Sequence, residues 1–194
     1  MKNATAVKER PILFSGPMIR AILRDRKTQT RRAVNPQPWQ EPDGALGWRS
    51  KGDYIEWNNG RGDLSPYGVP GDRLWVRETW VPTSSEKSCV YRTDFTDRIG
   101  HFWPSIAADP KDVTWKPSIF MPRWASRITL EITEVRVQRV QEISPDDIVA
   151  EGIPKHLNAD TEYIRLWDFL NAKRGYSWAS NPWVWAIGFK RVTI

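Results

Sequence analysis

The chain has 194 residues, with 29 Lys and Arg against 23 Asp and Glu, a net charge of +6. Its one cysteine, Cys89, excludes an intramolecular disulfide, and one cysteine with two histidines excludes a four-ligand thiolate zinc cluster. The chain contains no apolar run of about 18 residues, the length that would predict a membrane span. We therefore expect a single cytoplasmic domain over 1–194, with no membrane partner and no metal.

Positive charge gathers at the N-terminal end. Residues 1–34 hold nine basic and two acidic residues, a net charge of +7, whereas residues 35–194 hold 20 basic and 21 acidic residues. This asymmetry favours an anionic partner, with nucleic acid or a nucleotide ahead of acidic lipid. A solvated basic face that only aids solubility is the alternative. The twelve tryptophans fit either base stacking beside a basic surface or packing in a β-rich core.

The first elements predicted are a strand and a helix. After a polar leader over 1–11, the apolar run at 12–14 predicts a short strand. Ser15 and Pro17 then predict a helix start, and the helix should end near 25–27. Its apolar stripe consists of Met18, Ile19, Ile22 and Leu23.

Two long irregular insertions are predicted next, at 35–66 and 82–115. The first is rich in Pro and Gly, and the second is rich in Trp, Pro and Asp. Loops of this length are commonly functional or mobile. Between them, the alternation over 73–80 predicts a strand. A short strand is predicted within the second insertion, at 90–92.

The last third predicts strands and two helices. Residues 126–140 alternate as a strand, with a one-position slip near Thr133-Glu134 that predicts a β-bulge or a tight bend. The run Ser144-Pro145-Asp146-Asp147 predicts a short helix that stops at Gly152. A helix over 161–173 should carry Ile164, Trp167 and Leu170 on one apolar face, and 183–189 predicts a closing strand. The few strand–helix alternations favour an α+β fold, a small, mostly antiparallel barrel with flanking helices.

The segment 24–32 is the most informative part of the chain because it is dense in basic residues. Like charges beside Lys27 can lower the pKa of its amine and favour the neutral form. A neutral lysine within reach of a threonine hydroxyl could act as a base and make the hydroxyl a nucleophile. In a strand, Thr28, Thr30 and Arg32 would share one face. The alternative is that a basic helix end only complements the helix dipole.

The run from Asp25 to Arg32 resembles the Gly-x-Lys-x-x-x-x-Arg signature of the ASCH domains, which have a PUA-like β-barrel. The stretches 67–72, 181–185 and 187–190 are also similar to the longer ASCH proteins encoded by phages and prophages. The resemblance covers most of 11–193. One departure is plain, since Asp25 stands at the Gly position of the motif.

This resemblance implies recognition of a nucleobase or RNA in a basic cleft. The motif is similar to that of the bacterial N4-acetylcytidine amidohydrolase, which implies a metal-independent site without a cofactor. Residue by residue, it places the catalytic Lys on Lys27, the Thr on Thr30 and the Glu on Glu151. Thr30 would attack, Lys27 would take its proton, and Glu151 would deliver one to the leaving nitrogen. Arg32 or backbone N–H groups could stabilise the oxyanion. The alternative for Glu151 is an exposed acid at a helix end.

A second set of residues is predicted to bind nucleic acid. Arg73, Trp75 and Arg77 share one strand face and could form a stacking surface flanked by cations. Alternatively, Trp75 is a core residue with snorkelling arginines beside it. The full predicted binding set consists of Arg26, Arg31, Arg32, Arg73, Trp75, Arg77, Arg123 and Trp124.

Three functions remain open on the sequence. The first is an amidohydrolase acting on N4-acylated cytidine or a related nucleoside, which requires the polar atoms of Lys27, Thr30 and Glu151 to converge within hydrogen-bond reach. The second is a non-catalytic module for single-stranded RNA or modified DNA, which requires a continuous positive groove. The third is a phage regulatory or anti-defence protein that binds another protein through an exposed apolar patch.

Overall fold

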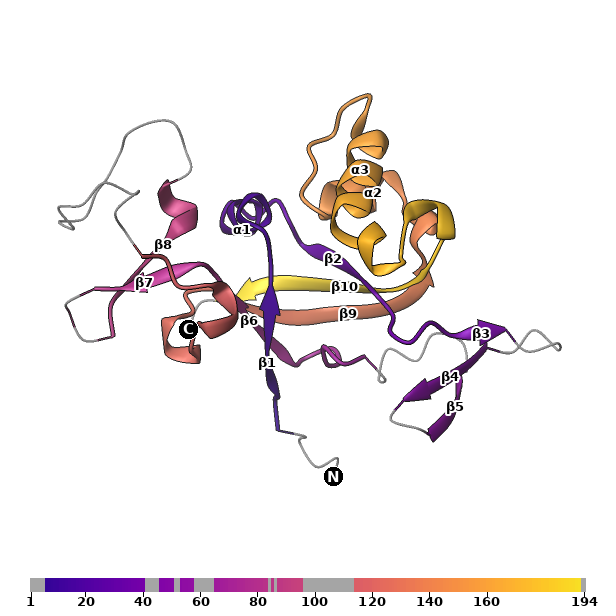
Figure 1. The fold of residues 1–194 in the computed structure, drawn as a ribbon, viewed down its shortest axis with the longest axis horizontal. Coiled ribbons are helices and arrows are strands. Elements are labelled where there is room, and N and C mark those ends of the chain that lie inside the picture. The colour runs from indigo at the N-terminus through magenta and orange to yellow at the C-terminus, as the bar shows by residue number, and fades with distance from the viewer. Residues whose placement is uncertain are drawn as a thin grey trace.

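The computed structural model describes residues 6–40, 46–50, 53–57, 65–83, 85, 87–95 and 114–192 (Figure 1). The helices are α1 (Gly16–Leu23), α2 (Pro145–Ala150) and α3 (Ala159–Asn171). The strands are β1 (Glu9–Leu13), β2 (Gln29–Ala33), β3 (Trp39–Gln40), β4 (Leu46–Ser50), β5 (Asp53–Trp57), β6 (Arg73–Arg77), β7 (Trp80–Pro82), β8 (Cys89–Tyr91), β9 (Thr129–Arg139) and β10 (Trp183–Val192). No helix in these ranges is long and apolar enough to cross a membrane.

The main sheet has five strands in the order β1-β6-β9-β10-β2. Strands β1 and β6 run parallel, and the other neighbours run antiparallel. The fold is therefore α+β, as predicted. The predicted barrel closure is not seen, since β1 and β2 are the two edges and do not pair with each other in the described residues.

Both predicted insertions contain strands. The segment 35–66, predicted to be irregular, holds the antiparallel sheet β3-β4-β5. The strand predicted at 90–92 is β8, which pairs with β7. Most of the second insertion, 96–113, lies outside the described residues.

The long pairing of β9 with β10 contains the predicted bulge. Gly188 pairs with Glu134 and Phe189 pairs with Ile132, so Thr133 is the extra residue. A Cβ on Gly188 would lie 3.1 Å from Thr133 Oγ1. The slip in the hydrophobic pattern is thus confirmed as a change of register.

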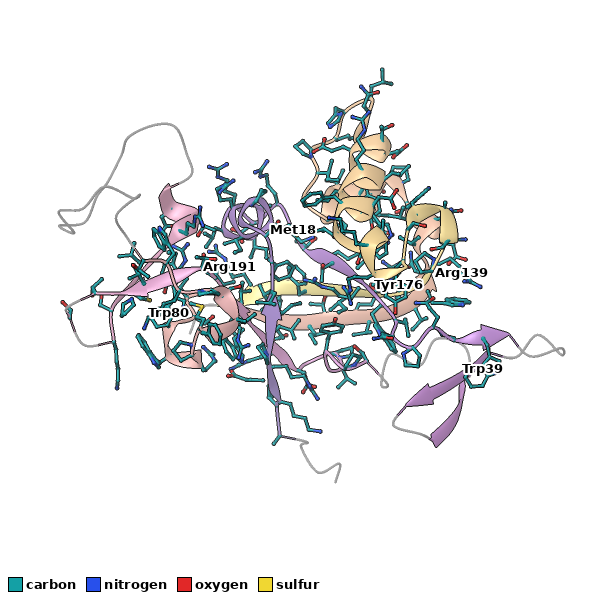
Figure 2. All side chains as sticks on the ribbon, viewed as in Figure 1. Met18, Trp39, Trp80, Arg139, Tyr176 and Arg191 are labelled. Carbon is teal, nitrogen blue, oxygen red and sulfur yellow. The ribbon has the colours of Figure 1, made fainter. Side chains whose placement is uncertain are left out.

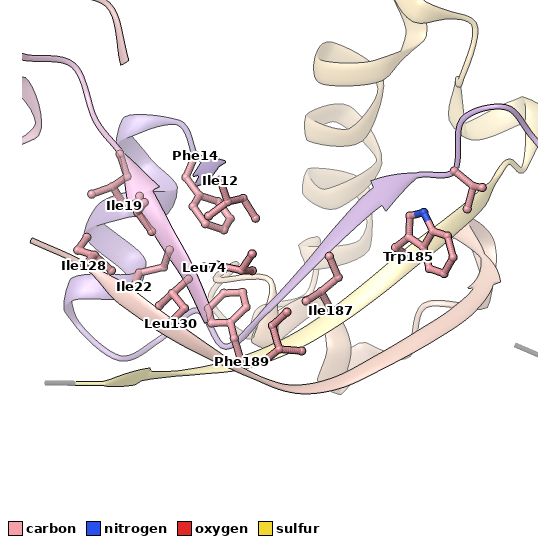
Figure 3. Close-up of a cluster of buried hydrophobic side chains, with 13 residues drawn as sticks. Ile12, Phe14, Ile19, Ile22, Leu74, Ile128, Leu130, Trp185, Ile187 and Phe189 are labelled. Atoms are coloured by element: carbon pink, nitrogen blue, oxygen red, sulfur yellow. The ribbon is translucent and has the colours of Figure 1, made fainter. Parts of the chain in front are cut away.

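Two apolar clusters hold the helices onto the sheet. In the first, Ile19 and Ile22 of α1 pack with Phe14, Leu74 and other strand residues (Figure 3). In the second, Tyr163 and Trp167 of α3 pack with Val184 of β10 and with α2. Because β10 contributes Trp185 to the first cluster and Val184 to the second, it is buried on both faces.

Two predicted strand boundaries in the main sheet are wrong. Strand β1 begins at Glu9, inside the predicted leader, and tolerates Pro11 because it is an edge strand. The strand predicted over 73–80 stops at Arg77. There the side chain of Glu78 is fully buried and binds Arg127 and Thr93 instead of continuing the alternation.

The buried face of α3 is shifted from the apolar face that the sequence predicted. The helix buries Tyr163, Trp167 and Asn171, which follow one another at intervals of four residues. Leu170 is 41% exposed, and Ile164 is only partly buried. The indole of Trp167 donates to the Tyr176 carbonyl at 2.8 Å, which turns this face of the helix toward the sheet.

Candidate functional site

The basic motif, which is the segment 24–32, and the short helix α2 meet at the β2 edge of the main sheet. Lys27 Nζ donates to Glu151 Oε2 at 2.6 Å and to the Glu151 carbonyl at 2.8 Å. Lys27 is 2% exposed and Glu151 is 6% exposed. Two residues that lie 124 positions apart in the sequence therefore form a buried ion pair, and Glu151 is not an exposed acid at a helix end.

The local backbone explains how Lys27 reaches this position. Helix α1 ends at Leu23, and Asp25 follows with a φ of +52°. This is the left-handed conformation that a glycine adopts without steric cost. Asp25 adopts this conformation although it carries a side chain, and the turn brings Lys27 to the end of α2.

The other side of the pair depends on Gly152. It stops α2 with a φ of +95°, as predicted. A Cβ on this residue would lie 3.1 Å from both the Ala21 and the Lys27 Cβ atoms. Backbone conformation and close packing both favour glycine here, directly after the acid that binds Lys27.

Burial lowers the pKa of the Lys27 amine below the ordinary lysine value. The Glu151 carboxylate opposes this shift, while Arg32 and Arg31 add smaller effects in the same direction as burial. The direction agrees with the sequence-based prediction, but the main physical cause is desolvation rather than neighbouring charge.

A second acid on α2 extends the network. Arg31 donates to Asp147 Oδ2 at 2.8 Å, to Gln29 Oε1 at 2.6 Å and to Glu151 Oε1 at 3.3 Å. Arg136 adds a bond to Asp147 at 3.2 Å. Alone, burial would raise the pKa of Asp147, but Arg31 and Arg136 hold it below its ordinary value. Part of the N-terminal positive charge is therefore neutralised by α2.

A pocket of about 260 Å³ lies between this network, α1 and α3. Thr30, Arg32 and Glu151 line it, and so do Tyr67 and Tyr163. Met18 lines its α1 side and lies between α1 and the α2–α3 pair in Figure 2. Pockets for drug-sized ligands span roughly 300–1,000 Å³, so this one lies just below that range.

The three predicted catalytic residues do not all touch one another. Lys27 binds Glu151, and Thr30 shares the pocket with Glu151. The described residues show no hydrogen bond between Lys27 Nζ and the Thr30 hydroxyl. Thr30 is 3% exposed, so its hydroxyl is approached through the pocket rather than from bulk water.

The predicted binding residues divide between two places. Arg31 and Arg32 line the pocket, and the Arg32 guanidinium donates to the Leu13 carbonyl at 2.5 Å and lies over the Phe14 ring. Arg26 is exposed and lies after the end of α1. The others lie on or beside β6 and do not line this pocket; they are Arg73, Trp75, Arg77, Arg123 and Trp124.

The β6 group has contacts of its own within the protein. Trp75 is 8% exposed, and the Arg77 guanidinium lies 4.6 Å from its ring centre. Arg123 binds Glu9 at 2.9 Å, and Arg73 lies 3.9 Å from the same carboxylate. Trp124 remains exposed. This arrangement agrees with the alternative in which Trp75 is a core residue, with the Arg77 guanidinium over its ring.

Two residues of the site were not predicted from the sequence. Asp147 could have been found, because it lies four positions before Glu151 and so shares a helix face with it. Tyr163 reaches the pocket from α3, and no motif marks it. The described residues contain no group of three or more His, Cys, Asp or Glu side chains placed to hold a metal ion.

Comparisons with known proteins do not identify the family. No family model matches the chain, and no curated protein does. Among solved structures, the chain is similar to the crystal structure of protein EF3133 from Enterococcus faecalis V583, described with the family DUF984. The identity is 9%, the TM-score is 0.46, and the match covers 97% of this chain and 82% of that chain.

Proposed function

We propose that this chain is an ASCH domain of PUA-like fold, interrupted by two insertions, that hydrolyses the exocyclic amide of N4-acylated cytidine or a related nucleoside in the β2 pocket. The observation that carries the proposal is the buried contact of Lys27 Nζ with Glu151 Oε2 at 2.6 Å, beside a pocket that Thr30 also lines. A lysine with a lowered pKa, a carboxylate and a hydroxyl are the three groups that this reaction requires.

The reaction is a transfer of the acyl group to Thr30 followed by hydrolysis. The proton of the Lys27–Glu151 pair first shifts onto the Glu151 carboxylate, which leaves the Lys27 amine neutral. Thr30 Oγ then attacks the acyl carbon, and its proton passes to that amine. Because Lys27 and Glu151 are in direct contact, a proton can pass through Glu151 to the exocyclic nitrogen as the C–N bond breaks. The products are cytidine and an ester on Thr30, which water hydrolyses to the free acid and the threonine.

The pocket has the donors that this ligand would use. Buried nitrogen donors without an acceptor in the described residues include Arg31 Nε and Arg32 Nε, and both arginines line the pocket. An unpartnered buried donor costs free energy until a ligand supplies an acceptor. A cytosine offers two acceptors, its N3 and O2 atoms, besides the acyl oxygen.

The test is hydrolysis of N4-acetylcytidine, followed by chromatography of cytidine. We expect Thr30→Val to lower the rate by about 10³-fold or more, while Thr30→Ser keeps part of it because the hydroxyl remains. Thr28→Val is the matched control, because Thr28 is exposed and does not line the pocket. Absence of turnover by the wild-type protein, or equal rates for Thr30→Val and Thr28→Val, would contradict the proposal.

A non-catalytic binding module is the second candidate. It is favoured by the missing hydrogen bond between Lys27 and Thr30 in the described residues, since a binding site needs no proton path. In that case single-stranded RNA or modified DNA would bind with an affinity that falls steeply with salt. Thr30→Val would then leave the dissociation constant nearly unchanged, whereas Arg32→Gln would raise it.

A further inference from the structure

The hydroxyl of Tyr163 is a buried group without a partner. Tyr163 belongs to α3, is 3% exposed and lines the same pocket as Thr30 and Glu151. Its Oη atom has no hydrogen-bond partner in the described part of the chain. Buried tyrosine hydroxyls normally have one, so this donor is unsatisfied until something enters the pocket.

The ring that carries this hydroxyl is held firmly in place. Its centre lies 6.5 Å from that of Trp167 and 6.1 Å from that of Trp178, the second at an interplanar angle of 80°. Trp167 is itself fixed by its bond to the Tyr176 carbonyl. The hydroxyl therefore occupies a defined position and does not swing freely to find an acceptor elsewhere.

The surroundings keep the hydroxyl in its protonated form. Burial raises the pKa of Tyr163 well above the ordinary tyrosine value, and the Glu151 carboxylate raises it further. Both oxygens of that carboxylate are engaged, one by Lys27 and the other by Arg31. The hydroxyl is thus a neutral donor that has no acceptor among the residues that the structure describes.

We propose that the Tyr163 hydroxyl donates a hydrogen bond to the acyl oxygen of the bound substrate and stabilises the oxyanion that forms there. This inference rests on the proposed function and adds a catalytic residue from outside the basic motif. When Thr30 Oγ adds to the acyl carbon, the C=O π-electron pair moves onto the oxygen. Tyr163 binds that negative charge and keeps its own proton, and the charge returns to the carbonyl as the C–N bond breaks. A rigid donor of this kind acts mainly in the transition state.

The test compares Tyr163→Phe with Tyr176→Phe. The Tyr176 hydroxyl donates to Asn35 Oδ1 at 3.1 Å and does not line the pocket, so it is a matched control. We expect Tyr163→Phe to lower kcat/KM for N4-acetylcytidine by about 100-fold and to leave the melting temperature unchanged or higher. Tyr176→Phe should keep kcat/KM and lower the melting temperature slightly. The inference would be overturned if Tyr163→Phe had the same kcat/KM as the wild type, or if its melting temperature were clearly lower than that of the wild type.

A wild-type protein without turnover would refute the proposed function, and binding would then decide the inference. Calorimetry with N4-acetylcytidine on the wild type and on Tyr163→Phe is the measurement. A loss of affinity of about tenfold, close to the contribution of one hydrogen bond, would support Tyr163 as the donor to the acyl oxygen. Equal affinities, or no binding to either protein, would overturn it.

Discussion

Lys27 and Glu151 form a buried ion pair, with Nζ and Oε2 2.6 Å apart and side-chain exposures of 0% and 5%. Breaking a buried pair by removing one member typically costs about 3–5 kcal/mol, and without Lys27 the Glu151 carboxylate keeps only the longer contact with Arg31, at 3.3 Å, among the described residues. We therefore expect Lys27→Met to lower the free energy of unfolding by about this amount, measured by urea denaturation.

The double variant Lys27→Met with Glu151→Gln tests the physical origin of that loss. Because it removes both charges, it should be more stable than Lys27→Met alone, although Arg31 also loses a charged partner. A double variant as unstable as the sum of the two single variants would show that the pair does not act through its charges.

The contact of Gly152 with Lys27 gives a second prediction. Gly152→Ala adds a Cβ at a φ of +95° and 3.1 Å from the Lys27 Cβ. The backbone conformation alone costs about 1–2 kcal/mol, and displacement of Lys27 adds to it. We expect a loss of stability above that range, together with a loss of hydrolysis in the chromatographic assay.

Gly71→Ala is the control for this variant. Gly71 has a φ of +93°, but a Cβ there would meet no atom within 4 Å. It should therefore show only the backbone cost and keep full activity. Similar losses of stability and activity in both variants would argue against a role for the contact between Gly152 and Lys27.

Asp25 offers a stabilising substitution. Its φ of +52° is disfavoured for a residue with a Cβ, and its ion pair with Arg191, at 3.1 Å, is exposed and contributes little. Asp25→Gly should raise the free energy of unfolding by about 0.5–1 kcal/mol. Asp25→Asn, which loses the charge but keeps the side chain, separates the two effects in thermal denaturation. The prediction is wrong if Asp25→Gly is less stable than Asp25→Asn.

The sequence predicted the local features of the site better than its assembly. Cap and stop residues such as Ser144 and Gly152 place α2 correctly, because their effects act within one turn of helix. The contact of Lys27 with Glu151 joins positions 124 residues apart, so no local pattern contains it. Lys27 was singled out by the basic residues around it, whereas Glu151 was named only through a family resemblance.

Other features depended on contacts that only the folded chain creates. Leu170 continues the apolar period of α3, yet the buried face is set by Trp167 and its bond to Tyr176. Trp75 and Arg77 lie on the same strand face, as the residues of an open stacking surface would. In the folded chain, however, the Arg77 guanidinium lies over the Trp75 ring. The alternation could identify the shared face without showing what covers it.

The Arg31–Asp147 pair gives the stability a defined pH dependence. Arg31 and Arg136 hold the pKa of Asp147 below its unfolded value, which is about 3.9. In acid the unfolded chain therefore binds a proton more readily than the native protein. This contribution to stability is complete above the unfolded pKa and is lost as the pH falls through the lower folded pKa.

We expect Asp147→Asn to cost about 2–3 kcal/mol at pH 7 and to flatten the fall in stability below about pH 4. Asp146→Asn is the control, because Asp146 lies in the same first turn of α2 but is exposed. Urea denaturation from pH 2.5 to 7 would decide the matter, since equal acid slopes for Asp147→Asn and the wild type would mean that the pair does not link folding to protons.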